Sequence, residues 1–171
     1  MSSSNSKAME IFVTGLRNQH AVEQQAVSLL SRQVERLENY PEMEARMRQH
    51  IDESKIQAQR IEELLSTMGE THSSLKDAGM SFMGNMAALA HTVAPDEVIK
   101  NSFANFAFEH FEIASYKSLL TLSDSLGQKG QSALKQSLAE EIDMAEWIDR
   151  HLSETTRRYV QLSEAGATAG L

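Results

Sequence analysis

Apolar residues recur with the period of an α-helix along almost the whole chain, and only two prolines, Pro41 and Pro95, interrupt the pattern. Proline cannot continue a helix but suits its first turn, so each proline predicts the start of a new helix. Gly69 and Gly127 predict the ends of two helices, because glycine readily adopts the conformation that closes a helix. The periodicity therefore predicts four long helices, over residues 7–38, 41–68, 95–126 and 131–163.

The connections between these helices predict how they pack. Tight turns join the first helix to the second and the third to the fourth, so these partners must run antiparallel. A crossover of about 25 residues separates the second helix from the third, and residues 73–92 within it show a weaker helical pattern. One long crossover is typical of ferritin-like bundles. We therefore predict an all-α, ferritin-like four-helix antiparallel bundle with a short fifth helix in the crossover.

The bundle is predicted to occupy residues 7–163 as one domain, with Phe103 and Tyr116 of the third helix turned toward its core. Residues 1–6 are polar and serine-rich, and residues 164–171 are small and glycine-rich. Both ends are therefore predicted to be flexible.

Composition narrows the function. The net charge of −8 argues against a nucleic-acid partner and against an anionic membrane surface, since both would need a basic face. The chain has no cysteine, which excludes thiolate zinc sites and iron–sulfur clusters. Any metal site must therefore use oxygen and imidazole ligands. No signal peptide or transmembrane stretch is recognisable, so we expect a cytoplasmic protein.

Five glutamates occupy positions where the helical pattern favours apolar residues. A buried carboxylate without a partner is very costly, and several together would repel one another. Two divalent cations would neutralise most of such a cluster. The candidate metal ligands are therefore Glu23, Glu53, Glu109, Glu112 and Glu141.

The spacing of these glutamates points to the same site. Residues on two antiparallel helices face each other when they are equidistant from the connecting turn. Glu23 and Glu53 are centred on the turn before Pro41, and Glu112 and Glu141 are centred on the turn at Gly127. Both pairs therefore lie at matching heights, about 22 Å from their turns at the helical rise.

The histidines leave several roles open. His50 lies three residues before Glu53, so it could bind the metal, orient Glu53 from outside the ligand set, or form a hydrogen bond in the core. His20 and His110 are expected to support the site from outside or to be structural. His50 is included among the candidate ligands.

Four stretches around these residues resemble a known family, at residues 20–25, 50–54, 108–116 and 138–141. On them the sequence is similar to the YciE/YciF-type family of bacterial ferritin-like stress proteins, from about residue 8 to residue 160. The Glu-His-aromatic-Glu-Ile-Ala-x-Tyr string that begins at Glu109 is its most specific part. The resemblance implies a ferritin-like bundle, a homodimer, a di-iron or related metal centre and a link to the stress response.

The broader ferritin and rubrerythrin pattern places Glu-x-x-His on the second and fourth bundle helices, and this chain departs from it. The second helix has the reverse order, His50-x-x-Glu53, and Met144 stands three residues after Glu141. By analogy with that fold, Glu53 and Glu141 would bridge two ions, Glu23 and Glu112 would be terminal ligands, and Glu109 a further one. Iron is favoured, with manganese or zinc as alternatives.

Other interpretations use the same bundle. It could be a non-catalytic, dimeric structural or interaction protein, a hydroxylase-like di-iron enzyme, or a subunit of a storage cage. The favoured one is a metal-binding, ferritin-like stress protein that oxidises iron or handles peroxide.

Overall fold

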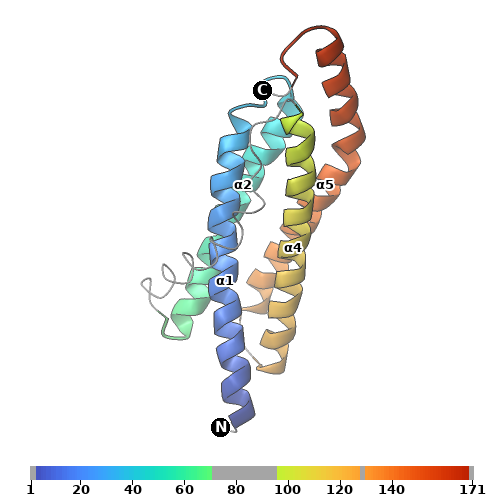
Figure 1. Ribbon diagram of the computed structural model, residues 1–171. Coiled ribbons are helices and arrows are strands. Elements are labelled where there is room, and N and C mark those ends of the chain that lie inside the picture. Colours follow the sequence, from blue (N-terminus) through green and yellow to red (C-terminus); the bar gives the residue numbers. More distant parts are fainter. Residues whose placement is uncertain (1–2, 71–95, 128–129, 170–171) are drawn as a thin grey trace.

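The computed structural model describes residues 3–70, 96–127 and 130–169, with side chains from residue 7 onward. Every regular element in these ranges is a helix, and none of these helices is long and apolar enough to cross a membrane. The predicted helix over 73–92 lies outside the described residues. The all-helical prediction is confirmed at this level, with α1 (Ser3–Val34), α2 (Pro41–Thr67), α4 (Glu97–Ser125) and α5 (Gln131–Glu164) (Figure 1).

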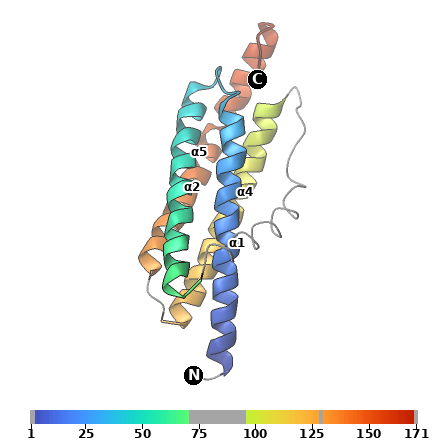
Figure 2. The same ribbon diagram turned by 90° about the vertical axis from the view of Figure 1, so that its left-hand side faces the viewer.

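The four helices form a bundle in which every neighbouring pair is antiparallel. Helices α1 and α5 run in one direction along the bundle, and α2 and α4 run in the other (Figures 1 and 2). Helix α1 packs against α2 and α4, and α5 packs against the same two helices from the opposite corner. Helices α2 and α4 therefore run parallel to each other.

Two apolar clusters fill the ends of the bundle, and a polar layer separates them. One cluster gathers around the turn between α1 and α2, with Met43 and Met47 packed near Ile148 of α5. The other lies toward the opposite end, with Phe12 of α1 packed near Leu134 of α5. Each helix therefore passes from one cluster to the other, and most of its buried polar residues fall between them, with Arg46, Ser123 and Thr155 as exceptions.

The apolar pattern of α4 predicts its buried face only in part. Tyr116 is fully buried, as predicted, but the Phe103 side chain is 54% exposed, so the prediction for Phe103 was wrong. The buried positions nearby are Ser102 and Asn105, so the inward face of α4 is polar over this stretch. Phe103 follows Ser102 by one residue, which turns its side chain about 100° away from the core.

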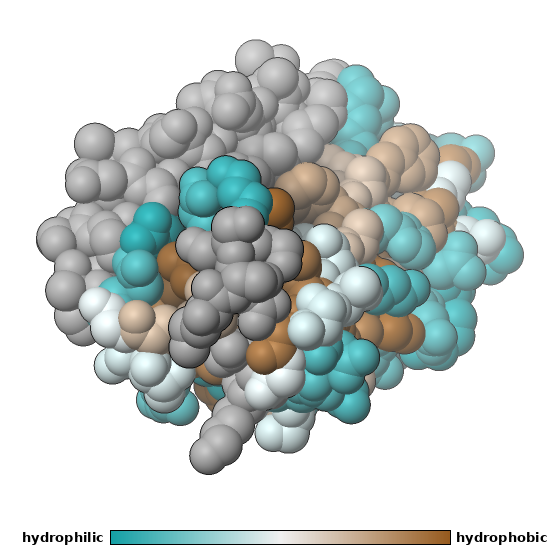
Figure 3. All heavy atoms as spheres, turned by 90° about the horizontal axis from the view of Figure 1, so that it is seen from below, coloured by the Kyte–Doolittle hydropathy of each residue, from teal (hydrophilic) through white to brown (hydrophobic). Residues whose placement is uncertain are grey.

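The end of the bundle at which α1 begins has a mixed surface, and the other end is closed by a hydrogen bond. In the end-on view of Figure 3, hydrophobic residues lie interspersed among hydrophilic ones over the described part of the end where α1 begins. At the other end, the Tyr40 hydroxyl donates a hydrogen bond to the carbonyl oxygen of Ala169, at 2.6 Å. That bond ties the segment after α5 to the turn between α1 and α2.

Candidate metal centre

Four ionisable side chains from three helices meet in the polar layer. His50 comes from α2, Glu109 and Glu112 from α4, and Glu141 from α5. One nitrogen or oxygen atom of each lies within 4.8 Å of those of the others, and all four residues are buried. The arrangement could hold a metal ion.

Helical spacing explains why these side chains converge. Glu109 and Glu112 lie three residues apart, so they share one face of α4. On α2, His50 lies one turn after buried Met47 and one turn before buried Ser54, so it continues the inward stripe. Glu141 lies seven residues after Leu134, two turns further along the buried face of α5.

His50 faces the cluster with its Nε2 atom. Its other ring nitrogen, Nδ1, contacts the carboxylate of Glu53. Its Nε2 lies 3.1 Å from Oε2 of Glu109 and 3.6 Å from Oε2 of Glu141, without forming a hydrogen bond. Its Nδ1 lies 2.9 Å from Oε2 of Glu53. When Nδ1–H donates to Glu53, the lone pair of Nε2 faces the cluster, which is the state that a metal ligand needs.

Glu53 lies outside the four-residue cluster and beside the surface, where its side chain is 18% exposed. It accepts hydrogen bonds from Gln49, at 2.7 Å, and from Arg46, at 3.1 Å. Glu53 is three residues from His50 and one from Ser54, so the helical phase places it at the edge of the buried stripe. The geometry therefore puts Glu53 behind His50, as a group that orients the imidazole.

Glu23 of α1 is fully buried next to the cluster without being one of its four members. Its Oε1 accepts hydrogen bonds from the Tyr116 hydroxyl, at 2.5 Å, and from the Gln19 amide, at 2.9 Å. The Gln19 amide also lies 3.4 Å from Oε1 of Glu112. Glu23 is thus linked to the cluster through an amide that serves both carboxylates.

Burial dominates the protonation of the acidic side chains. It raises the pKa of Glu23 from 4.5 to about 7, against the hydrogen bonds from Tyr116 and Gln19. Burial, reinforced by neighbouring carboxylates, also raises the pKa of Glu112 and of Glu141 well above the usual value. The polar layer therefore binds protons at neutral pH unless another cation compensates its charge.

His50 and Glu53 behave in the opposite sense because they have partners. Burial is the largest influence on the His50 pKa and lowers it, but the carboxylates of Glu109, Glu53 and Glu141 together raise it well above 6.5. Burial would raise the pKa of Glu53, but hydrogen bonds from His50, Gln49 and Arg46 together bring it from 4.5 to about 2. Glu53 is therefore ionised at neutral pH, as a partner for His50 must be.

Unsatisfied polar atoms of this layer could bind a cation. Buried polar atoms in proteins almost always have a hydrogen-bond partner, because leaving one without a partner is costly. Five atoms of the cluster have no such partner among the described residues, and neither has Oε2 of Glu23. An oxygen-rich set with one imidazole suits iron, manganese or zinc. The five cluster atoms are Nε2 of His50, Oε2 of Glu109, Oε2 of Glu112 and both oxygens of Glu141.

The two other candidate histidines lie apart from this cluster. Nε2 of His20 lies 2.7 Å from Oε1 of Glu62, which joins α1 to α2. His110 is exposed and meets the ring of Phe106 edge-on, with the ring centroids 4.5 Å apart. His20 therefore joins two helices, and His110 packs at the surface. Neither is a member of the cluster.

Sequence reasoning missed the partners that hold the ligands. Gln19 lies one turn before Glu23, and Tyr116 lies one turn after Glu112, so each extends the face that carries its carboxylate. Tyr116 was predicted only as a core residue, and Gln19 was not singled out. A polar residue one turn from a buried carboxylate is the signal that would have found both.

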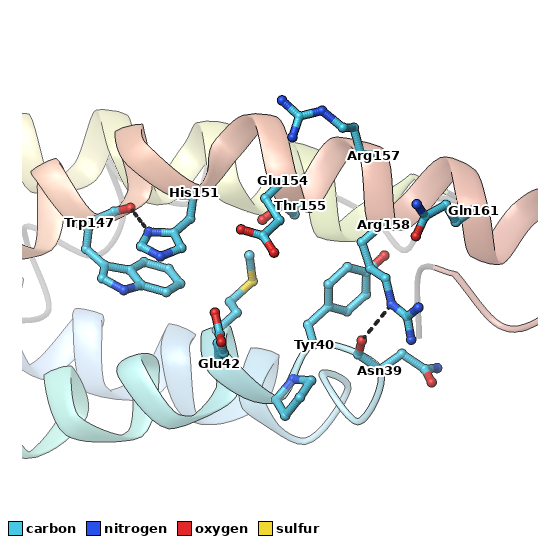
Figure 4. A pocket seen from close by; sticks show the side chains of 12 residues that line it. Asn39, Tyr40, Glu42, Trp147, His151, Glu154, Thr155, Arg157, Arg158 and Gln161 are labelled. Carbon is cyan, nitrogen blue, oxygen red and sulfur yellow. Dashed lines mark hydrogen bonds between the residues drawn. The ribbon is translucent and has the colours of Figure 1, made fainter.

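A separate cavity of about 670 Å³ lies between the turn at Tyr40 and helix α5, and no cluster residue lines it (Figure 4). The rings of Trp147 and His151 stack in its wall, with centroids 4.0 Å apart. Nδ1 of His151 donates to the carbonyl oxygen of Trp147, at 2.7 Å, which fixes the ring. This cavity contributes nothing to the metal centre.

Known proteins are similar to this chain in sequence and in fold. Residues 7–161 match the family described as Domain of unknown function (DUF892). Protein YciF of Escherichia coli strain K12 is 29% identical over 150 residues, which cover 80% of this chain and 86% of YciF.

Two crystal structures resemble the bundle. A protein of Xanthomonas campestris pv. campestris str. ATCC 33913 matches with a TM-score of 0.77 and 26% identity, over 92% of this chain and 99% of that one. The E. coli stress protein YciF matches with a TM-score of 0.66 and 21% identity, over 85% of this chain and 94% of that one. The all-helical architecture is thus common to these proteins.

Proposed function

The chain belongs to the YciF-type family described as Domain of unknown function (DUF892), and we propose that it is a ferritin-like protein that binds two divalent metal ions in its core. The observation that carries the proposal is the buried cluster of His50, Glu109, Glu112 and Glu141, whose facing atoms have no hydrogen-bond partner. The antiparallel order of the helices, with parallel α2 and α4, supports a ferritin-like topology.

Five side chains would hold the ions. His50 through Nε2, Glu109 and Glu141 would bind one ion, since both carboxylates lie within 3.6 Å of that nitrogen. Glu23 would bind the second, and Glu112 would serve both, because the Gln19 amide joins these two carboxylates. Four carboxylates would balance the charge of two divalent ions, which supports this number of ions.

The protein around the ions would fix and shield them. Glu53 orients His50, and Tyr116 and Gln19 orient Glu23. The apolar clusters keep bulk water away from the layer at both ends of the bundle. Iron is the favoured metal, with manganese or zinc as alternatives, and bound iron would supply redox chemistry suited to iron oxidation or peroxide handling.

The cellular role is part of the same proposal, and the description of one relative supports it. One similar structure is described as a stress protein of E. coli. We infer a role in the bacterial stress response, as a homodimer in the cytoplasm. Light scattering of the purified chain would give the mass of a dimer and would separate it from a larger cage.

Metal analysis of protein purified without chelator tests the proposal. We expect about two ions per chain after loading with Fe(II), since the layer offers four carboxylates. Replacing Glu141 by Gln removes one ligand charge from the core and should lower the stoichiometry. Glu146→Gln on the exposed face of the same helix is the matched control and should leave it unchanged. A wild-type stoichiometry far below two, not restored by added Fe(II), would refute the proposal.

A further inference from the structure

A second cavity reaches the metal centre from the side. It lies between α1 and α4 and has a volume of about 390 Å³, within the range of small-molecule sites. Its lining runs from Ala26 of α1 to Arg36 in the turn after that helix, and along α4 from Glu97 to Glu109. The twelve helical steps from Glu97 to Glu109 span about 18 Å, so the cavity is elongated. One end is at Glu109, a member of the metal cluster, and the other is at the ion pair of Arg36 and Glu97.

The walls between these two ends combine apolar side chains with three amides, of which that of Asn101 donates to Glu97 at 3.4 Å. Leu29 and Leu30 line one side, Phe108 lines the other, and the small side chain of Ala104 leaves room between them. Gln33 and Asn105 also line the cavity, but their amides donate to each other, at 3.2 and 2.8 Å. The middle of the cavity therefore favours an apolar occupant.

The outer end carries more positive than negative charge. Arg32 and Arg36 line it together with one carboxylate, that of Glu97. Nη2 of Arg36 lies 2.8 Å from Oε2 of Glu97, yet the buried Nε of Arg36 has no hydrogen-bond acceptor among the described residues. A buried donor without an acceptor is costly, and a carboxylate is the acceptor that a guanidinium binds best.

We propose that this cavity binds a small aliphatic monocarboxylate, with its carboxylate at Arg36 and Arg32 and its apolar chain directed toward Glu109. This charge pattern is the reverse of what an entry path for metal cations needs, because two guanidinium groups would repel them. That the apolar chain of the ligand ends next to the ions rests on the proposed metal-binding function. Binding of its carboxylate at the arginines does not depend on that function.

Calorimetric titration with octanoate tests the binding site. We expect saturable binding of one octanoate per chain and none of octanol, which has no carboxylate. Ala104→Leu should abolish binding by filling the cavity, whereas Ala114→Leu, on the exposed side of the same helix, should not change it. Arg36→Gln should raise the Kd roughly tenfold or more through the lost charged hydrogen bond. Arg32→Gln, at an exposed position, should also raise it. Absent binding, or equal affinity in wild type, Ala104→Leu and Arg36→Gln, would overturn the proposal.

A second measurement tests the orientation of bound octanoate in the cavity. In protein loaded with Mn(II), the paramagnetic ions should broaden the methyl carbon signal of bound octanoate more than its carboxylate signal. Stronger broadening of the carboxylate would mean that octanoate binds the ions directly, which contradicts the proposal. The metal content of the same sample separates the two hypotheses. Protein that holds two ions but does not bind octanoate would refute the monocarboxylate site and keep the metal-binding function. Protein that binds octanoate but holds no ions would refute the metal-binding function.

Discussion

Nδ1 of His50 lies 2.9 Å from Oε2 of Glu53, and this contact fixes which nitrogen of the imidazole faces the core. Arg46 and Gln49 in turn hold the Glu53 carboxylate in place. The sequence placed both residues among the ligands. In the structure, Nε2 of His50 faces the cluster, and Glu53 lies on the far side of the imidazole, outside the four-residue cluster.

Replacing Glu53 by Gln should weaken metal binding without abolishing it. The amide still accepts a hydrogen bond from His50 but no longer carries the charge that makes the imidazole more basic. Changes of this kind typically cost about 10–100-fold in metal affinity. Competition with a chelator of known affinity would measure the effect. Glu63→Gln, at an exposed position of the same helix, is the control, and an equal loss in both variants would contradict this role.

The metal-free protein should lose stability as the pH rises from about 5 to 8. The pKa of Glu23 is raised to about 7, and the pKa values of Glu112 and Glu141 are raised as well. A group with a raised pKa in the folded state stabilises the fold fully below its unfolded pKa and loses that contribution as the pH rises through the folded value. His50, whose pKa is also raised, acts in the same direction.

Urea denaturation at several pH values, with chelator and with metal, would measure this dependence. Each unit of pKa difference corresponds to about 1.4 kcal/mol, so the free energy of unfolding should fall by several kcal/mol without metal. Bound metal should remove most of the fall. Below pH 4.5 the trend should reverse in part, because Glu53, with its pKa lowered to about 2, loses its contribution as it becomes protonated. A metal-free stability that does not change between pH 5 and 8 would argue against a crowded carboxylate layer.

Tyr116→Phe should destabilise the protein through Glu23. The substitution removes the hydroxyl that donates to Glu23 at 2.5 Å inside the core and leaves the carboxylate short of a partner. Above pH 7, where Glu23 is ionised, a hydrogen bond to its charged carboxylate contributes about 1.5–3 kcal/mol. A double-mutant cycle with Glu23→Gln, followed by urea denaturation, isolates this interaction. Strictly additive effects of the two substitutions would show that the pair does not interact.

Gly130→Ala should destabilise the turn between α4 and α5 more than Gly127→Ala does. Both glycines have positive φ, +101° and +60°, where a side chain is strained. A Cβ atom at Gly130 would lie 2.8 Å from Cδ1 of Leu64, whereas one at Gly127 would meet nothing within 4 Å. Thermal unfolding of both variants would measure the difference. Equal melting temperatures would show that Leu64 moves aside freely.

The sequence predicted the helices well because their limits depend on local chemistry. Pro41 begins α2 as expected, and α4 ends at Ser125, just before Gly127. The first helix ends at Val34, four residues before the predicted limit, because residues 35–40 form turns closed by backbone hydrogen bonds. Burial was harder to predict at Phe103, since the polar face of α4 lies inward there and the apolar pattern alone gave no sign of it.

The candidate site was predictable in composition but not in detail. Glu109, Glu112 and Glu141 come together with His50, whereas Glu53 lies behind His50 and Glu23 lies beside the cluster. Height along the bundle was enough to bring these residues into one layer. The rotation of each helix decides which side chain points inward, and a shift of one residue turns a side chain by about 100°. Spacing within one sequence does not fix that angle when His50 and Glu53 are only three residues apart.

Anomalous scattering from a crystal of the metal-loaded protein tests the central claim most directly. With data collected at the absorption edge of the bound metal, we predict two anomalous peaks inside the bundle. One should lie about 2.0–2.1 Å from Nε2 of His50, the usual bond length between zinc and an imidazole ligand. The second should lie between the carboxylates of Glu23 and Glu112. Anomalous peaks only at the protein surface, with the buried layer empty in fully loaded protein, would contradict the account.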